Sequence, residues 1–297
     1  MTPAAPAARL LLGIGFAVAA VFLFAAGDTL TKVLLQRQPV ERVAAVRYVV
    51  GLLILVVALG PRLGPRLWRV TRPGLVLLRS LTLTFATLVI GYALRLLPVG
   101  ETIAIMYLAP FAVMALAAPL LGERVSRAGW LFAGLGFAGV LLIVRPGTAL
   151  NPAGVGLALL LAASNTAFHL ITRLLSRTET PLALLFHVTL VGAVFFVVAA
   201  IPSLDAPLPD LTDFLLMASL GAIFTLGHFL FAAAYREAPT TLIAPVNYLH
   251  FVWATLMGWG IFGHVPDGVT LAGMAMILAS GAAIALRAHL LGRAQRG

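Results

Sequence analysis

The chain of 297 residues has no cysteine, which excludes disulfide bonds, thiolate metal sites and cysteine nucleophiles together. Charged residues make up only 10% of the sequence, and Lys32 is the single lysine. With 61% hydrophobic residues, the chain has too little polar surface to solvate a water-soluble globule of this length. The composition therefore predicts a protein whose main solvent is lipid.

Motifs of common enzyme classes are missing as well. The sequence holds no H-E-x-x-H metal motif, no G-x-S-x-G nucleophile elbow and no P-loop, and Lys32 does not follow a phosphate-cradling glycine array. We therefore expect no cofactor, no metal site and no work driven by ATP bound to this chain. A membrane-embedded lipid-modifying enzyme that uses intramembrane histidines, and a passive channel, stay open as alternatives to a transporter.

Long apolar runs dominate what is present. A helix needs about 20 mainly apolar residues to cross the hydrocarbon core of a bilayer. The hydropathy predicts ten such spans, at residues 10–32, 43–60, 75–95, 99–121, 128–144, 153–172, 183–201, 212–235, 239–262 and 268–286. The connections are too short for a soluble domain, so we predict an all-α membrane protein.

An internal repeat organises these spans. The first 141 residues reappear, shifted by 141 positions, without a gap in matches such as Gly13 with Gly154, Pro61 with Pro202, and Tyr107 with Tyr248. Five spans per copy predict two repeats, residues 1–147 and 148–297, which meet at a linker near residues 146–152 that is rich in proline and glycine.

Positive charge is distributed unevenly between the connections. Thirteen arginines lie in the terminal segments and in the connections after even-numbered spans, against five basic residues after odd-numbered spans. The positive-inside rule then places both termini in the cytoplasm. Because each repeat has an odd number of spans, the two repeats are inverted, which favours alternating access around a central cavity. The net charge of +10 lies in these short connections, so we expect no nucleic-acid partner.

Besides the five-plus-five spans, the sequence has Gly122-Glu123 after the fourth span, a glycine-rich fifth span, and Arg145-Pro146-Gly147 after it. In these features the chain resembles the ten-helix EamA type of the drug/metabolite transporter superfamily. The resemblance implies a central cavity lined by the first, third, fourth, sixth, eighth and ninth spans. It also implies export of amino acids and other metabolites. The second repeat departs from the pattern, since Gly263-His264 stands where Gly-Glu is expected.

Polar side chains independently mark the same spans. In lipid they tend to point inward, and a spacing of three or four residues gathers them on one helix face. The candidate cavity residues are Asp28, Thr84, Thr87, Tyr107, Asn165, His169, His228, Asn247, Tyr248, His250 and Trp253. The fifth and tenth spans have no ionisable residue and are rich in glycine and alanine, which suits close packing, a peripheral position or a homodimer interface.

Several charged residues also admit a purely structural role. Asp28 stands four residues before Lys32, so it either lines the cavity or forms an ion pair on one helix face. Arg47 and Arg79 lie within a turn or two of their span ends, and we expect them to reach lipid headgroups.

The histidines and Asn247 carry the candidate chemistry. His169 and His228 could relay a proton, because an imidazole changes charge near neutral pH; the alternative is a neutral ring bonded to a neighbouring group. The amide of Asn247 can donate and accept, and so can hold both ends of a zwitterion.

Two prolines interrupt spans that are counterparts in the repeat. Pro110 and Pro245 each remove a backbone donor and leave the carbonyl of Met106 or Thr241 without its partner. Paired interruptions of this kind point to a binding site and to gating, with a static bend as the alternative.

The sequence as a whole predicts a secondary transporter that exports amino acids and related small metabolites by alternating access. The abundance of arginine, alanine, glycine and proline indicates a GC-rich bacterial gene and hence a bacterial inner membrane. The expected partners are a small-molecule substrate and the lipid bilayer. Proton antiport and facilitated diffusion both stay open as the source of driving force.

Overall fold

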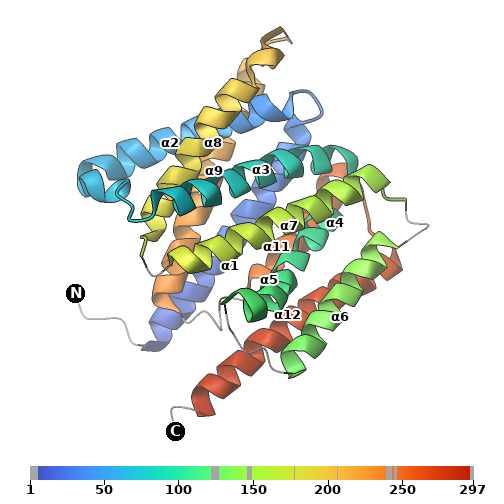
Figure 1. Ribbon diagram of the computed structural model, residues 1–297. Coiled ribbons are helices and arrows are strands. Elements are labelled where there is room, and N and C mark those ends of the chain that lie inside the picture. Colours follow the sequence, from blue (N-terminus) through green and yellow to red (C-terminus); the bar gives the residue numbers. More distant parts are fainter. Residues whose placement is uncertain are drawn as a thin grey trace. The chain divides into compact units, whose positions relative to one another are not determined.

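The computed structural model describes residues 6–121, 127–145, 149–176, 178–205, 207–238, 243 and 246–294 (Figure 1). Across these residues the chain forms helices and connections, and no strand occurs among them. The helices pack as two compact units. Unit 1 comprises Met1–Ala26, Pro98–Leu150 and Leu226–Gly297, and unit 2 comprises Gly27–Leu97 and Asn151–Thr225.

Unit 2 is built mainly from four long helices, in which α3 packs against α7 and α8, and α2 packs against α8. These are α2 (Val40–Leu63), α3 (Pro73–Leu96), α7 (Pro152–Leu175) and α8 (Pro181–Ala199). The C-terminal part of α1 (Pro6–Leu34), the N-terminal part of α9 (Leu211–Glu237) and two short 3-10 helices, η1 (Gly64–Leu67) and η2 (Ile201–Asp205), complete it.

Local sequence fixes where the helices of unit 2 begin. Three of them, α3, α7 and α8, start with proline, whose missing N–H would have no partner in the first turn in any case. The side chain of Asn151 accepts hydrogen bonds from two backbone N–H groups at the start of α7, and Thr180 accepts one at the start of α8.

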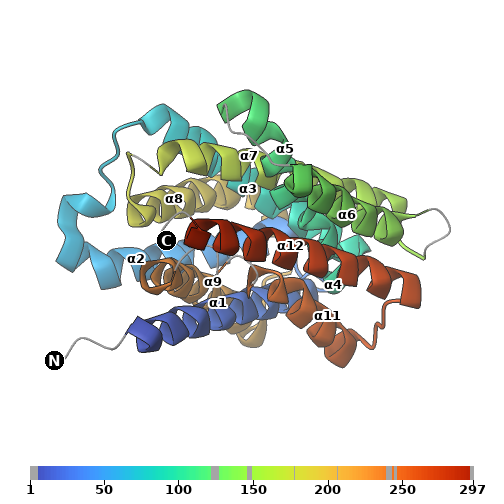
Figure 2. The same ribbon diagram turned by 90° about the horizontal axis from the view of Figure 1, so that it is seen from below.

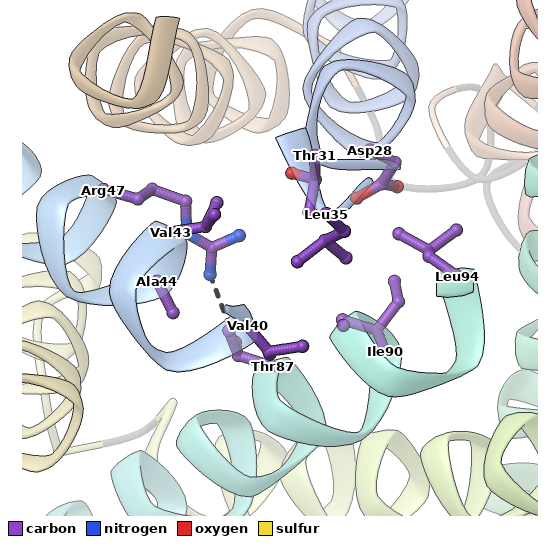
Figure 3. Close-up of a pocket in the computed structure, with 11 residues that line it drawn as sticks. Asp28, Thr31, Leu35, Val40, Val43, Ala44, Arg47, Thr87, Ile90 and Leu94 are labelled. Carbon is purple, nitrogen blue, oxygen red and sulfur yellow. Dashed lines mark hydrogen bonds between the residues drawn. The ribbon is translucent and has the colours of Figure 1, made fainter. Parts of the chain in front are cut away.

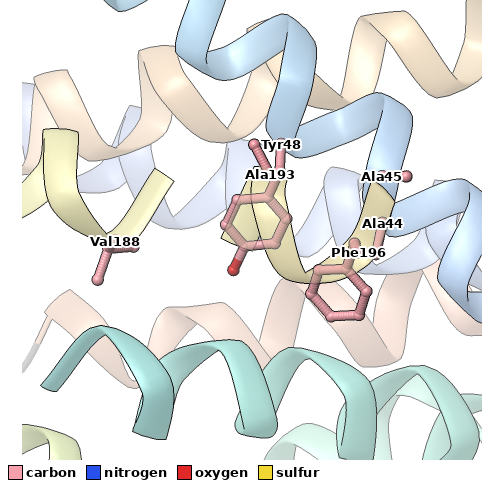
Figure 4. Packing of buried hydrophobic residues seen from close by; sticks show 6 residues of the cluster. All are labelled: Ala44, Ala45, Tyr48, Val188, Ala193 and Phe196. Atoms are coloured by element: carbon pink, nitrogen blue, oxygen red, sulfur yellow. The ribbon is translucent and has the colours of Figure 1, made fainter. Parts of the chain in front are cut away.

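One hydrophobic core cluster of unit 2 lies between α2 and α8 (Figure 4). The rings of Tyr48 and Phe196 stack in it, with their centroids 5.5 Å apart. Gly192 makes this possible, because a Cβ there would lie 2.4 Å from Cδ1 of Tyr48. The phenolic oxygen of Tyr48 reaches Thr87 Oγ1 at 2.8 Å, so the cluster also orients a predicted cavity residue.

Unit 1 contains the remaining helices, in which α12 packs against α6 and α11 packs against α4 (Figure 2). They are α4 (Val99–Met106), α5 (Leu108–Leu121), α6 (Arg127–Val144), α11 (Leu249–Phe262) and α12 (Gly268–Ala294). Glycine permits both close pairs. A Cβ on Gly139 would lie 2.6 Å from the carbonyl oxygen of Gly273, and one on Gly100 would lie 2.4 Å from Thr255 Oγ1.

The helices match the spans expected from hydropathy. Within the part of the chain that the structure describes, eight helices are long and apolar enough to cross a membrane, and two shorter apolar helices, Leu249–Phe262 and Gly268–Ala283, fall in the ninth and tenth predicted spans. The prediction of an all-α membrane protein is confirmed.

The fourth span differs from a single continuous helix. It divides at Tyr107, where a turn separates α4 from α5 three residues before Pro110. In the second repeat α11 begins directly after the equivalent Tyr248. Pro245, Gly122-Glu123 and the Pro146-Gly147 part of the linker lie outside the described residues.

Equivalent connections of the two repeats dock on equivalent helix starts within unit 2. Gln38, between α1 and α2, donates a hydrogen bond to Asp213 in the first turn of α9, at 3.0 Å. Its counterpart in the second repeat, Glu179, accepts one from the N–H of Arg72 just before α3, at 2.9 Å. Arg72 and Asp213 are themselves counterparts under the 141-residue shift, so one contact is the repeat image of the other.

These two contacts lie at opposite ends of α3. Glu179 binds at the N-terminal end of α3, whereas Arg95, in the last turn of α3, donates to the carbonyl oxygen of Gln38 at 2.9 Å. A helix of this length spans roughly 36 Å, enough to cross the hydrocarbon core. Equivalent segments therefore lie at opposite ends of unit 2, as inverted repeats require.

Candidate functional site

A polar pocket opens between α1, α2 and α3 within unit 2 (Figure 3). Asp28 and Thr31 enter it from α1, Arg47 from α2 and Thr87 from α3, while the rest of the lining is apolar. Asp28 is buried, with 7% of its surface exposed. The cavity volume is about 20 Å³, room for one water-sized group in this conformation.

Arg47 is held in the polar pocket by hydroxyl and aromatic partners. Its Nη2 donates to Thr87 Oγ1 at 3.2 Å, and the guanidinium lies 4.4 Å from the ring centroid of Phe224 and 4.7 Å from that of Tyr48. Such stacking is favourable for a cation out of water. The prediction that Arg47 extends to lipid headgroups is therefore wrong, because these partners turn it into the pocket.

Lys32, one turn beyond Asp28, binds the end of α3. Its Nζ donates to the carbonyl oxygens of Leu94 and Leu97, at 2.6 and 2.5 Å. An ammonium group at this place is also stabilised by the partial negative charge at the C-terminal end of α3. The contact fixes the end of α1, and with it Asp28, relative to α3.

Other predicted site residues of unit 2 lie along α3 and α7. Asn165 donates to the carbonyl oxygen of Leu161 in its own helix at 3.2 Å, and the His169 ring lies against that of Phe168. Thr84 is buried, and its Oγ1 has no hydrogen-bond partner among the described residues.

Arg79 is also placed differently from the prediction. It is buried, donates to Thr172 Oγ1 at 2.7 Å and to the carbonyl oxygen of Leu184, and lies over the Phe168 ring. It joins α3 to α7 and α8 and does not reach a headgroup region, because all of its partners lie inside unit 2.

An aromatic cluster lies within unit 1, around the interruption between α4 and α5. The ring centroid of Tyr107 lies 5.1 Å from that of Tyr248 and 6.2 Å from that of His250. The hydroxyl of Tyr107 donates to the carbonyl oxygen of Asn247. The structure therefore brings together four of the predicted site residues, including the two repeat-equivalent tyrosines.

The aromatic cluster contains polar atoms that the described fold leaves unsatisfied. Asn247 donates to the hydroxyl of Tyr235 at 3.5 Å, but its Oδ1 is buried with no partner among the described residues. The indole N–H of Trp253 is likewise buried with no hydrogen-bond partner among the described residues, and the Trp253 ring packs edge-on against Phe22. His228 lies against Phe24, with their centroids 4.9 Å apart.

Glu101 and His264 form a pair that sequence reasoning missed. Glu101 lies in the first turn of α4, and His264 Nε2 lies 2.6 Å from its Oε1. The signal in the sequence was the replacement of Gly-Glu by Gly263-His264, but nothing there identified the partner, 163 positions away. Nearby, Asp267 accepts hydrogen bonds from the N–H of Thr270 and from Arg145, which hold the pKa of its carboxyl below the ordinary value.

Comparison with known proteins places these sites in a family context. The model of the EamA-like transporter family matches the chain twice, at residues 11–145 and at residues 152–286. The two matches correspond to the two copies of the internal repeat and together cover most of the chain.

Curated relatives are similar over most of their length. The chain is 27% identical to an S-adenosylmethionine uptake transporter of Rickettsia bellii, over 90% of this chain and 91% of that protein. It is 27% identical to a riboflavin transporter of Brucella anthropi, over 78% and 83%, and 26% identical to a pseudopaline exporter of Pseudomonas aeruginosa, over 90% and 93%.

The fold also matches a protein of known crystal structure. The TM-score is 0.68 at 20% sequence identity, and the match covers 96% of this chain and 99% of the other. At this level of identity the match identifies the fold alone.

Proposed function

Because the chain belongs to the EamA-like transporter family, we propose that it exports amino acids and related small metabolites across a bacterial inner membrane by alternating access. The observation that carries the substrate class is the polar pocket of unit 2, where Asp28 and Arg47 line one cavity. A buried acidic and a half-buried basic side chain in one site complement the ammonium and the carboxylate of an α-amino acid.

Each end of such a substrate has a partner of suitable chemistry. The carboxylate binds the guanidinium of Arg47 and the Thr87 hydroxyl beside it, and the ammonium binds the carboxylate of Asp28. The cavity is small, so the helices must part for the substrate to enter, and only its amino-acid end is held in the polar pocket. The side chain of the substrate is then weakly restricted, which favours broad specificity.

The chain is a membrane transporter and not an enzyme, as its family and its named relatives agree. Those relatives are named for different small molecules. One of them, S-adenosylmethionine, carries an α-amino acid group, which supports a substrate of this class. The distribution of arginine between the connections supports an orientation with both termini in the cytoplasm.

The test is amino-acid exchange by the purified protein in liposomes. Liposomes loaded with unlabelled leucine, methionine, threonine or phenylalanine are given each radiolabelled amino acid outside, and we expect saturable exchange of at least one of them. Arg47→Gln and Asp28→Asn should each lower this exchange at least tenfold, since a hydrogen bond to a charged group contributes roughly 1.5–3 kcal/mol.

Arg62→Gln is the matched control, because Arg62 is exposed at the end of the same helix as Arg47. It should exchange at the wild-type rate. Folded wild-type protein that exchanges none of the four amino acids, or an Arg47→Gln variant as active as the wild type, would contradict the proposal.

A further inference from the structure

Glu101 is a buried carboxylate with a single hydrogen-bonding partner among the described residues. Its side chain is 3% exposed, and Oε1 lies 2.6 Å from Nε2 of His264. The other oxygen, Oε2, is buried and has no partner among those residues. A carboxylate withdrawn from water is costly unless it is paired, and among the described residues the imidazole of His264 is the side chain that pairs with it.

His264 connects this buried carboxylate to solution. Its side chain is 40% exposed, and it stands just after Gly263, whose positive φ of 67° ends α11 and turns the chain. The imidazole is thus partly exposed at the protein surface, while its Nε2 contacts the buried carboxylate.

Among the described residues, the other charged groups of the elements packed on α4 are remote from the pair or already engaged. Arg145, which follows α6, binds Asp267 at 3.0 Å, and Arg127 lies at the opposite end of α6. On α11, His250 lies at the N-terminal end, beside Tyr107. The described side chains of α5, and those of α12 up to residue 283, carry no charge.

The helix that carries Glu101 also carries part of the aromatic cluster. Glu101 lies in the first turn of α4, and Tyr107 caps its other end. Their separation of six positions corresponds to roughly 9 Å of helix. Directly before Glu101, Gly100 is in close contact with Thr255 of α11. A change at Glu101 is therefore transmitted along one short rigid element to the contact of Tyr107 with Asn247.

We propose that Glu101 and His264 form a proton-binding site whose protonation state sets the position of α4, and that a proton gradient drives transport through it. With the imidazole protonated the pair is neutral overall; when that proton leaves, one negative charge stays buried at the start of α4. The gain or loss of this charge favours different positions of α4 and Tyr107. The link to transport rests on the proposed function, whereas the proton site does not.

Accumulation driven by a pH gradient tests the coupling. Liposomes with an acidic interior should accumulate the best-exchanging amino acid of the panel from outside, as protons leave. Glu101→Gln and His264→Asn should each accumulate at least tenfold less amino acid than the wild type, while their exchange stays within about twofold of the wild type. His187→Asn, which alters a histidine bonded to the Ala183 carbonyl of its own helix, should keep both activities.

A second readout needs no substrate. Deuterium exchange of the amides of Val99–Met106, corrected for intrinsic rates, should change between pH 8 and pH 5.5 in the wild type and stay constant in Glu101→Gln. If Glu101→Gln fails to fold, the same deuterium-exchange comparison is made between the wild type and His264→Asn.

The outcomes separate the two proposals. Wild type that exchanges amino acids without accumulating them, or variants that accumulate like the wild type, would overturn the proton site and leave the proposed function standing. No exchange at all would end the proposed function, and the deuterium-exchange comparison would still decide whether the pair binds a proton that moves α4.

Discussion

At the scale of single residues, partners distant in the sequence decide what each charged side chain does. Arg47 and Arg79 occupy similar places near span ends, where a long side chain commonly reaches the headgroups. Thr87 and Phe224 turn Arg47 into the polar pocket, and Thr172 and the Leu184 carbonyl hold Arg79 inside unit 2. Span position alone could not predict these partners, because they lie on other helices.

The predicted polar stripes were more informative than the charges. Tyr107, Asn247, Tyr248 and His250 were chosen as polar residues of two interrupted spans, and the structure brings them together in the aromatic cluster. Helical periodicity places residues on one face, which is why such groups can be predicted. Their role in binding substrate stays a prediction.

That role is testable at Asn247 and His228. Asn247→Ala removes the amide donor and the buried Oδ1, which has no partner among the described residues, and His228→Ala removes the ring beside Phe24. Each should reduce saturable exchange about five- to tenfold, the effect of roughly 1–1.4 kcal/mol for one lost hydrogen bond, with an unchanged melting temperature. His187→Ala should have no effect, and wild-type exchange by both variants would move the binding site elsewhere.

At the scale of elements, the bilayer makes helices predictable. Every backbone group in hydrocarbon must find its partner within the chain, so an apolar run of sufficient length is a helix. The grouping of those helices was not predictable in the same way. The sequence predicts the two repeats but not which of their helices pack together, and α1 and α9 each contribute residues to both compact units. Hydropathy predicts whether a helix lies in lipid, but it does not predict which other helices pack against it.

The connections make contacts that the sequence did not reveal. Glu179 is buried in the connection between α7 and α8 and accepts hydrogen bonds from the backbone N–H groups of Thr71 and Arg72 and from the Thr71 hydroxyl. Burial raises the pKa of this carboxyl, but the hydrogen bonds lower it more, and the net pKa lies below its ordinary value.

Stability should depend on pH through this contact. A lowered carboxyl pKa stabilises the fold above the unfolded pKa of about 4.3, and that contribution is lost as pH falls through the folded value. Glu179→Gln should therefore destabilise the protein by roughly 1–2 kcal/mol at pH 7, and the difference from wild type should shrink below about pH 4. Thermal unfolding at both pH values measures this.

Asp205→Asn provides the control, because Asp205 is exposed at the end of η2. It should leave the melting temperature unchanged at both pH values. A Glu179→Gln variant as stable as the wild type at pH 7, or a deficit that grows on acidification, would contradict the account of this connection.

At the scale of the whole molecule, the duplication supplies the transport mechanism that we propose. The contact of Gln38 with Asp213 and that of Glu179 with Arg72 are repeat images at opposite ends of α3. Two copies of one structure in opposite orientations can exchange conformations, so an opening at one membrane face implies an equivalent opening at the other. This symmetry is the reason why we propose alternating access as the mechanism.

The absence of native cysteine allows a direct measurement of this inversion. Arg66 and Pro207 are exposed and equivalent under the 141-residue shift, and they lie just before α3 and α9. Single variants Arg66→Cys and Pro207→Cys would be treated with a membrane-impermeant maleimide in intact cells and in inverted membrane vesicles. Inverted repeats predict labelling of Pro207→Cys in cells and of Arg66→Cys in inverted vesicles; labelling of both from the same side would contradict the account.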